Sequence, residues 1–192
     1  MNEERPRILV IVGTVRRGRT GRAIADWYLS QARSLEPQVD YELLDVADLD
    51  LPLFDEPTPP LYRQYSALQE RLAEPVARAD GFVLVSGEYN RSIPGSLKNF
   101  LDYLYPEWNR KPAALVTYGG PGGGLRAAEH LVQVMGNLGV CVVRDQVSLP
   151  RVWELVGPEG VKVPDATAIA AQLAELRWWI LALRRARQGA GV

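Results

Sequence analysis

An arginine-rich loop follows the first apolar run of the chain and carries groups that bind anions. Residues 13–22 contain four arginines and two threonines, directly after the apolar residues 8–12 and before a segment with helical spacing. Free backbone N–H groups at a helix N-terminus, together with guanidinium groups, favour a phosphate. We therefore predict a phosphate site in this loop. The alternative is a solvated basic turn, and the position between strand and helix argues against it.

Two common nucleotide motifs nearly fit the same loop. A dinucleotide fingerprint needs glycine at positions 13, 15 and 18, but the side chain of Val15 would block the close approach of a pyrophosphate. A P-loop beginning at Gly13 would carry Arg19 where a compact lysine charge is needed. Both motifs are therefore disfavoured.

Two further loops carry groups that suit a planar ligand. Residues 88–92 follow the apolar run 81–85, and Tyr89 offers a flat surface beside several free backbone groups. Residues 117–124 are rich in glycine, which lets the backbone approach a ligand closely. The alternative for residues 88–92 is a turn whose Tyr89 merely packs, and the glycine run taken alone is also compatible with a flexible connector. With the arginine loop they predict a ligand that has a phosphate at one end and a flat, partly apolar group at the other.

Strand and helix patterns alternate along the chain and place these loops at one edge. The strands are expected at residues 8–12, 39–44, 82–85, 113–117 and 140–143. The helices are expected at 20–35, through Leu61, Tyr65, Leu68 and Leu72 with a break or kink at Pro75, from Pro94 to Leu104, over 128–138, and from a cap at Asp165 to about Arg187. This alternation predicts an α/β fold, a parallel sheet covered by helices on both faces, as one domain over residues 1–192. Ligands bind at the carboxyl ends of such strands.

Composition excludes several classes of partner. The 192 residues are 47% hydrophobic and 23% charged, with a net charge of −1, so neither nucleic acid nor an anionic membrane is expected as a partner. The longest uninterrupted apolar segment, residues 178–183, is too short to span a bilayer. The N-terminus lacks the apolar core of a signal peptide, and the single cysteine has no partner for an internal disulfide. We expect a cytoplasmic protein.

The remaining reactive or aromatic side chains are assigned structural roles. His130 is interpreted as a helix-surface residue rather than a proton donor, and Cys141 as a core residue. Asp102 and Glu107 are expected on a solvated or interface face rather than as an acid pair. For Trp153, Trp178 and Trp179 we predict packing within the C-terminal part of the chain or a contact between subunits. We therefore predict no catalytic side chain and no metal site.

The three loops together resemble a known family. Its motifs occur in order as Gly13-Thr14-x-Arg16-x-Gly18-Arg19-x-Gly21, Glu88-Tyr89-Asn90-x-Ser92-x-Pro94-Gly95-x-Leu97-Lys98-Asn99-x-x-Asp102 and Tyr118-Gly119-Gly120. From about residue 7 to residue 150 the chain resembles the NADPH-dependent FMN reductase family of flavodoxin-like quinone, azo and chromate reductases. The resemblance implies a flavodoxin-like three-layer sandwich whose five-stranded parallel sheet has the order 2-1-3-4-5. It also implies non-covalent FMN, NADPH or NADH as hydride donor, and a homodimer or dimer of dimers. One departure is Gly87, where the family commonly has proline.

Carried over by position, the resemblance implies three groups of FMN contacts. The phosphate would be held by Thr14, Arg16, Arg19, Thr20, Gly21 and Arg22. The isoalloxazine and ribityl groups would be bordered by Glu88, Tyr89, Asn90 and Arg91. The ring pocket would be completed by Thr117, Tyr118 and Gly119.

The implied activity is that of an FMN-dependent oxidoreductase. Hydride would pass from NAD(P)H through bound FMN to a quinone or similar small-molecule acceptor in a ping-pong cycle, because the flavin carries the chemistry and the protein positions it. The alternative is a flavodoxin-type electron carrier or flavin-binding redox sensor without its own turnover. Such carriers are usually strongly acidic. The near-neutral charge and open glycine loop of this chain favour a reductase.

Overall fold

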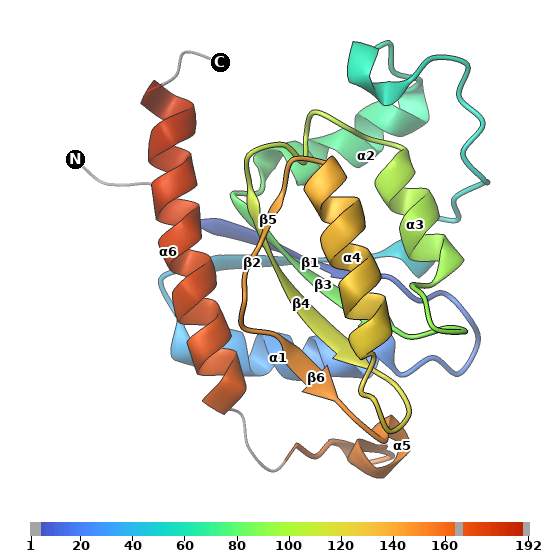
Figure 1. Cartoon of the computed structure of the whole chain (residues 1–192), viewed down its shortest axis with the longest axis vertical. Helices are drawn as coiled ribbons and strands as arrows, with labels where there is room; N and C mark the ends of the chain where they lie inside the picture. Colours follow the sequence, from blue (N-terminus) through green and yellow to red (C-terminus); the bar gives the residue numbers. More distant parts are fainter. Residues whose placement is uncertain (1–4, 164–166, 190–192) are drawn as a thin grey trace.

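The computed structural model describes residues 5–163 and 167–189 and shows a central parallel sheet between two layers of helices (Figure 1). The order along the sheet is β2-β1-β3-β4-β5, which confirms the predicted 2-1-3-4-5 arrangement. The four longer strands are β1 (Arg7–Val12), β2 (Asp40–Asp45), β3 (Gly81–Gly87) and β4 (Pro112–Tyr118). The central strand β3 and its neighbour β4 are buried along their whole length, because helices cover both faces.

The helices divide into two layers that match the two halves of the core. One layer holds α1 (Gly21–Leu35) and α6 (Thr167–Gly189), which pack on the sheet around Tyr28. The opposite layer holds α2 (Ala67–Arg78), α3 (Gly95–Asp102) and α4 (Leu125–Asn137), which pack around Phe82, Phe100 and Trp108 (Figure 1). The molecule is therefore the predicted three-layer sandwich. In the described part of the chain, no helix is both long and apolar enough to cross a membrane.

The fifth position of the sheet is split into two short strands. β5 (Cys141–Val142) pairs with the beginning of β4, and β6 (Val147–Leu149) pairs with its end. Between them the side-chain amide of Gln172 on α6 donates to the carbonyl oxygens of Leu115 (2.9 Å) and Asp145 (3.0 Å). A buried side chain thus satisfies the carbonyl of Leu115 at the gap, so the strand expected at 140–143 is shorter and a second short strand follows it.

Helix α2 begins later than the sequence pattern predicted and does not end at Pro75. The hydroxyl of Ser66 accepts from the backbone N–H of Gln69, whose side chain accepts from the N–H of Ser66, and this capping box fixes the start. Leu61 lies instead in the 3-10 turn η2 (Pro60–Tyr62) and is 57% exposed. Pro75 lies in the last turn, where it removes one helical hydrogen bond, and the helix continues to Arg78.

The positions of Cys141 and Glu107 differ from those predicted from the sequence. Cys141 lies on the edge strand β5 and is half-buried, so its assignment to the core was wrong. Glu107 is buried and accepts a hydrogen bond from the Tyr65 hydroxyl (2.7 Å), so the solvated alternative of its predicted solvated or interface face was wrong. Asp102 pairs with Lys98 at 2.7 Å. The expected cap at Asp165 lies outside the described residues.

A short element follows β6 and links the sheet to the last helix. It comprises α5 (Val152–Leu155) and a two-stranded antiparallel pair, β7 (Val156–Gly157) and β8 (Gly160–Val161). The 3-10 turn η1 (Val46–Asp48) follows β2 directly.

Lys111 is a buried cation whose titration should change the stability of the protein. Its ammonium donates to the carbonyl oxygens of Val76 (2.7 Å) and Ala77 (2.9 Å), at the end of α2. Burial, reinforced by the charge of Arg187, lowers the pKa of Lys111 from 10.5 to about 8. Between these two values the unfolded chain binds more protons than the folded protein, so the free energy of unfolding should rise with pH.

We expect this rise to disappear in Lys111→Met. For the natural protein, the contribution of Lys111 between pH 8 and pH 9.5 is about 1.5 kcal/mol, because the full slope of about 1.4 kcal/mol per pH unit is reached only above the folded pKa of about 8. Urea unfolding of both proteins at the two pH values measures the difference. An equal pH dependence in the variant and the natural protein would contradict the assignment to Lys111.

Candidate functional site

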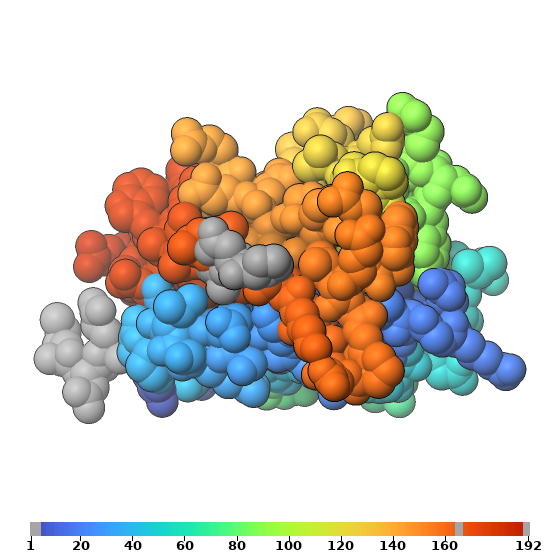
Figure 2. Space-filling model, turned by 90° about the horizontal axis from the view of Figure 1, so that it is seen from below, coloured from blue at the N-terminus to red at the C-terminus, as the bar shows by residue number. Residues whose placement is uncertain are grey.

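The three loops predicted to bind a ligand meet at the carboxyl edge of the sheet. The N–H of Gly13, just after β1, donates to the carbonyl of Val85 in β3 (3.0 Å). The N–H of Glu88, just after β3, donates to the carbonyl of Tyr118 at the end of β4 (3.2 Å). In Figure 2 the arginine loop, the tip around residue 90 and the glycine-rich loop all lie on the face in view, as the blue, green and yellow protrusions. Neighbouring parallel strands explain this convergence, because their carboxyl ends share an edge.

The arginine loop presents unpaired backbone donors. Within the described residues, no backbone hydrogen bond uses the N–H groups of residues 15–18, and the first helical bond of α1 runs from the N–H of Ile24 to the carbonyl of Thr20 (3.1 Å). The amides of residues 21–23 in the first turn of α1 therefore remain open, as at any helix N-terminus. Thr20 precedes α1, and its hydroxyl makes no capping hydrogen bond. This donor set matches the predicted anion site.

The three predicted phosphate-binding arginines differ in their partners. Arg19 donates through both terminal nitrogens to the carboxylate of Asp45, at 2.6 and 2.8 Å. Arg22 donates to Asp26 (3.1 Å) and also lies 3.6 Å from Asp45. Arg16 is exposed, and no carboxylate of the described residues pairs with it. Asp45 was missed in the sequence, although its place at the carboxyl end of a strand adjacent to β1 was a usable signal.

Thr14, Gly21 and Tyr118 form a buried junction beneath the arginine loop. The hydroxyl oxygens of Thr14 and Tyr118 lie 3.1 Å apart, and burial raises the pKa of the Tyr118 phenol. A Cβ atom added at Gly21 would lie 2.5 Å from both oxygens. The absence of a side chain at Gly21 therefore lets the start of α1 approach β4.

The second loop is a tight turn rather than an extended strap. Tyr89 and Ser92 exchange two backbone hydrogen bonds (2.9 and 3.0 Å), and the residues between them, Asn90 and Arg91, have φ values of +49° and +69°. Positive φ at both central positions is typical of a type I′ turn. Tyr89, Asn90 and Arg91 are all exposed, so the turn presents its tip to solvent.

Glu88 is held by the helix that follows the glycine-rich loop. Its carboxylate accepts from the backbone N–H of Arg126 (3.1 Å) and from the guanidinium of the same residue (3.2 Å). The exposed His130 of α4 also contacts this region, with Nδ1 2.9 Å from the Ser92 hydroxyl. These contacts place α4 as the support of the second loop, a role that the sequence pattern did not reveal.

Hydrogen bonds from residues of β4 and β6 fix the backbone of the glycine-rich loop. The hydroxyl of Thr117, buried at the end of β4, donates to the carbonyl of Gly123 (3.0 Å), and the Ser148 hydroxyl donates to the same oxygen (2.9 Å). Gly119 donates its N–H to the carbonyl of Leu149 (3.3 Å). The loop backbone is thus fixed against β6.

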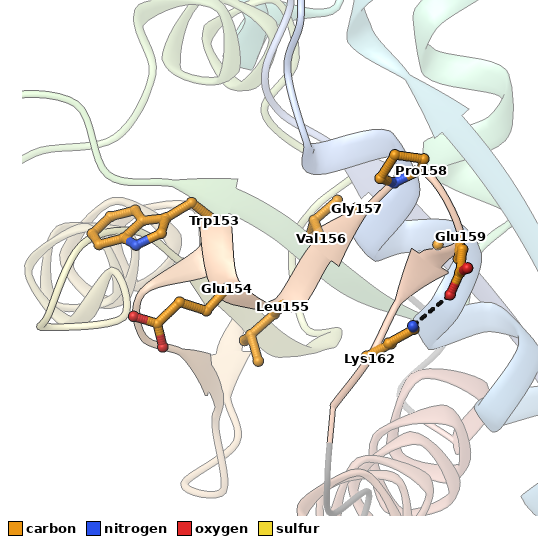
Figure 3. Close-up of a pocket in the computed structure, with 9 residues that line it drawn as sticks. Trp153, Glu154, Leu155, Val156, Gly157, Pro158, Glu159 and Lys162 are labelled. Atoms are coloured by element: carbon orange, nitrogen blue, oxygen red, sulfur yellow. Dashed lines mark hydrogen bonds and ion pairs between the residues drawn. The ribbon is translucent and has the colours of Figure 1, made fainter.

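The segment after β6 borders this loop but contains none of the predicted site residues. The N–H groups of Arg151 and Val152 donate to the carbonyls of Gly120 (2.9 Å) and Gly119 (3.0 Å). Beyond them lies an open hollow of about 410 Å³, lined by residues 153–160 and Lys162 (Figure 3). Trp153 points to the side away from Lys162 in Figure 3 and is 62% exposed, so it does not serve the expected packing within the chain.

No cluster of three histidine, cysteine, aspartate or glutamate side chains in residues 5–163 and 167–189 could hold a metal ion. The site therefore consists of backbone donors, arginines, hydroxyl groups and one exposed aromatic ring.

Comparison with known proteins places this arrangement in a family. Residues 6–154 match the family model described as NADPH-dependent FMN reductase. The chain is 41% identical over 151 residues to the NAD(P)H-dependent FMN reductase of Schizosaccharomyces pombe, covering 76% of this chain and 74% of that protein. It is 33% identical over 141 residues to a quinone reductase of Escherichia coli K12, covering 69% and 70% of the two chains.

A solved structure shows the same fold over nearly the whole chain. The flavoenzyme NAD(P)H:(acceptor) oxidoreductase of Paracoccus denitrificans superposes with a TM-score of 0.68 at 21% identity, covering 94% of this chain and 98% of that one. With the match of residues 6–154, these findings show that the chain belongs to the NADPH-dependent FMN reductase family.

Proposed function

We propose that this protein binds FMN at the carboxyl edge of its sheet and catalyses the oxidation of NAD(P)H by a quinone-type acceptor. The phosphate binds at the arginine loop, and the ring lies between the 88–92 turn and the glycine-rich loop. Family membership and the relatives named as FMN and quinone reductases support the proposal.

The observation that carries the proposal is the open donor set of the arginine loop. The unpaired amides of residues 15–18 lie in the same loop as the exposed side chain of Arg16, and the first turn of α1 follows directly. A doubly charged phosphate suits such a set, because each charged hydrogen bond also gains from the helix dipole. Thr14, Arg19, Thr20, Gly21 and Arg22 are proposed as the remaining residues of this phosphate site.

The ring end of the proposed site uses backbone rather than reactive side chains. Glu88, Tyr89, Asn90 and Arg91 border the ring on one side, while Thr117, Tyr118 and Gly119 border it on the other. The exposed Tyr89 offers a flat surface, and the glycine-rich loop admits a close approach by the ring. Bound FMN supplies the hydride chemistry, and the protein orients the ring and leaves one face open to donor and acceptor in turn.

Assembly and location are further parts of the proposal. We place the protein in the cytoplasm as a homodimer or dimer of dimers. In this proposal the subunits meet beside the second loop, at a hollow of about 440 Å³ that is lined in part by Ile93 and Val134. The free, half-buried thiol of Cys141 suits a reducing compartment.

Steady-state kinetics test the proposed reaction. With FMN and 1,4-benzoquinone present, we expect oxidation of NADPH or NADH to depend on the quinone. Double-reciprocal plots against the nicotinamide nucleotide at several quinone concentrations should be parallel, because donor and acceptor use one face in turn. The measurement is the absorbance decrease of the reduced nucleotide.

The control is the same assay without added FMN after the flavin has been removed. Activity that persists without FMN would contradict the assigned cofactor, and intersecting lines would contradict the ping-pong order. Flavin binding without any quinone-dependent oxidation would indicate an electron carrier or redox sensor.

A further inference from the structure

The carboxylate of Asp45 is buried at the edge of the arginine loop and holds one of its guanidinium groups. The Asp45 side chain is 1% exposed and the Arg19 side chain 18% exposed, and both carboxylate oxygens accept from Arg19, at 2.6 and 2.8 Å. Asp45 is itself fixed, because it ends β2 and accepts from the backbone N–H of Ala47 (3.1 Å) in η1. A forked pair of this kind fixes the plane as well as the position of the guanidinium.

Arg19 also ties the two ends of the loop together. Its Nη1 donates to the carbonyl of Thr14 at 2.6 Å, while its own backbone N–H donates to the carbonyl of Arg16 at 3.2 Å. One side chain thus links the beginning of the loop, its end and the adjacent strand β2. The open amides of residues 15–18 lie within the segment closed by these bonds.

We propose that Asp45 is a positioning residue of the phosphate site, acting through Arg19. Arg19, held by Asp45, closes the loop around its open amides and so places Arg16 and these amides for contact with the phosphate. This inference rests on the proposed function, since it concerns how the same site recognises the FMN phosphate.

Charge repulsion and loop positioning predict opposite changes in FMN affinity for the substitution Asp45→Asn. A carboxylate near a phosphate site repels the anion, so on charge alone Asp45→Asn should tighten FMN binding. If Asp45 positions the loop, the neutral amide can accept from only one arm of Arg19, and FMN binding should weaken. Asp26→Asn is the matched control, because it removes an equal charge from the beginning of α1 without touching Arg19.

The experiment is fluorescence titration of the flavin-free protein with FMN and with riboflavin, which lacks the phosphate. The natural protein should bind FMN more tightly than riboflavin. In Asp45→Asn we expect the Kd for FMN to rise by about tenfold or more, the scale of one charged hydrogen bond, while the Kd for riboflavin changes by less than about twofold. Asp26→Asn should leave the Kd for FMN unchanged or slightly lower.

Arg19→Lys provides a second variant if Asp45→Asn does not fold. Lysine keeps the charge but lacks the planar fork that reaches Asp45 and Thr14 together, so a similar loss of FMN affinity is expected. Undiminished FMN affinity in Asp45→Asn or Arg19→Lys would overturn the proposal. An equal loss for FMN and riboflavin would also overturn it. If the natural protein does not distinguish the two flavins, the proposed phosphate site itself fails.

Discussion

Gly124→Ala is expected to lower the free energy of unfolding by about 2–5 kcal/mol, from positive-φ strain and overpacking together. Gly124 precedes α4 with φ +84°, a conformation that non-glycine residues adopt at a cost of about 1–2 kcal/mol. An added Cβ would lie 2.8 Å from the backbone nitrogen of Tyr118 and 2.8 Å from Cβ of Thr117. Neither atom can move without displacing the end of β4, so the strain is not relieved locally.

Gly120→Ala is the matched control for this substitution. It lies in the same loop, but a Cβ there would meet no atom within 4 Å and its φ is not positive. Its effect on stability should stay within about 0.5 kcal/mol. Urea unfolding of the flavin-free proteins measures both changes, and equal effects at the two glycines would contradict the close approach of α4 to β4.

Trp108→Ala should destabilise the protein by about 3–5 kcal/mol, the usual cost of deleting a buried tryptophan. Trp108 is 0% exposed and is the largest fully buried side chain in residues 5–163 and 167–189. Its ring contacts Phe82 of β3 at 4.9 Å and Phe100 of α3 at 5.8 Å between centroids, both edge-on. The indole thus joins the strand and the helix that flank the second loop. A cavity at this position removes contacts on both sides.

Trp178→Ala is the control for Trp108→Ala, because it deletes an indole that is exposed rather than buried. Trp178 is 62% exposed on α6, and the one aromatic ring that it contacts among the described residues is that of Trp179. We expect a loss of no more than about 1 kcal/mol, the scale of one edge-to-face aromatic pair. Thermal or urea unfolding compares the two variants. A larger effect at Trp178 than at Trp108 would show that the assigned core is wrong.

The architecture and the three ligand loops were predictable from the sequence because their signals are local. Uninterrupted apolar runs such as residues 8–12 and 81–85 indicate buried strands. Their alternation with amphipathic helices is typical of a parallel sheet. The parallel direction of the strands brings the loops after β1, β3 and β4 to one edge, independently of the side chains in these loops. The arginine loop, the turn at 88–92 and the glycine-rich loop therefore meet where the sequence predicted.

Helix boundaries and the split edge strand were less predictable. The spacing of Leu61 and Leu68 suits a helix, but the capping box at Ser66 starts α2 later. Likewise, residues 140–149 contain enough apolar side chains for one strand, yet Gln172, distant in sequence, enters the gap between β5 and β6. A local pattern contains no information about a side chain that arrives from another element.

Tertiary structure alone decided which arginines pair with a carboxylate and which remains exposed. In the sequence, Arg16, Arg19 and Arg22 carry the same charge in the same loop, and nothing local separates them. The fold places Asp45, from a different strand, against Arg19 and within 3.6 Å of Arg22, and leaves Arg16 exposed. A pairing between residues 26 positions apart depends on the register of β1 against β2. The residue types thus predicted an anion site, whereas the sheet determined which guanidinium groups pair with a carboxylate and which stays exposed.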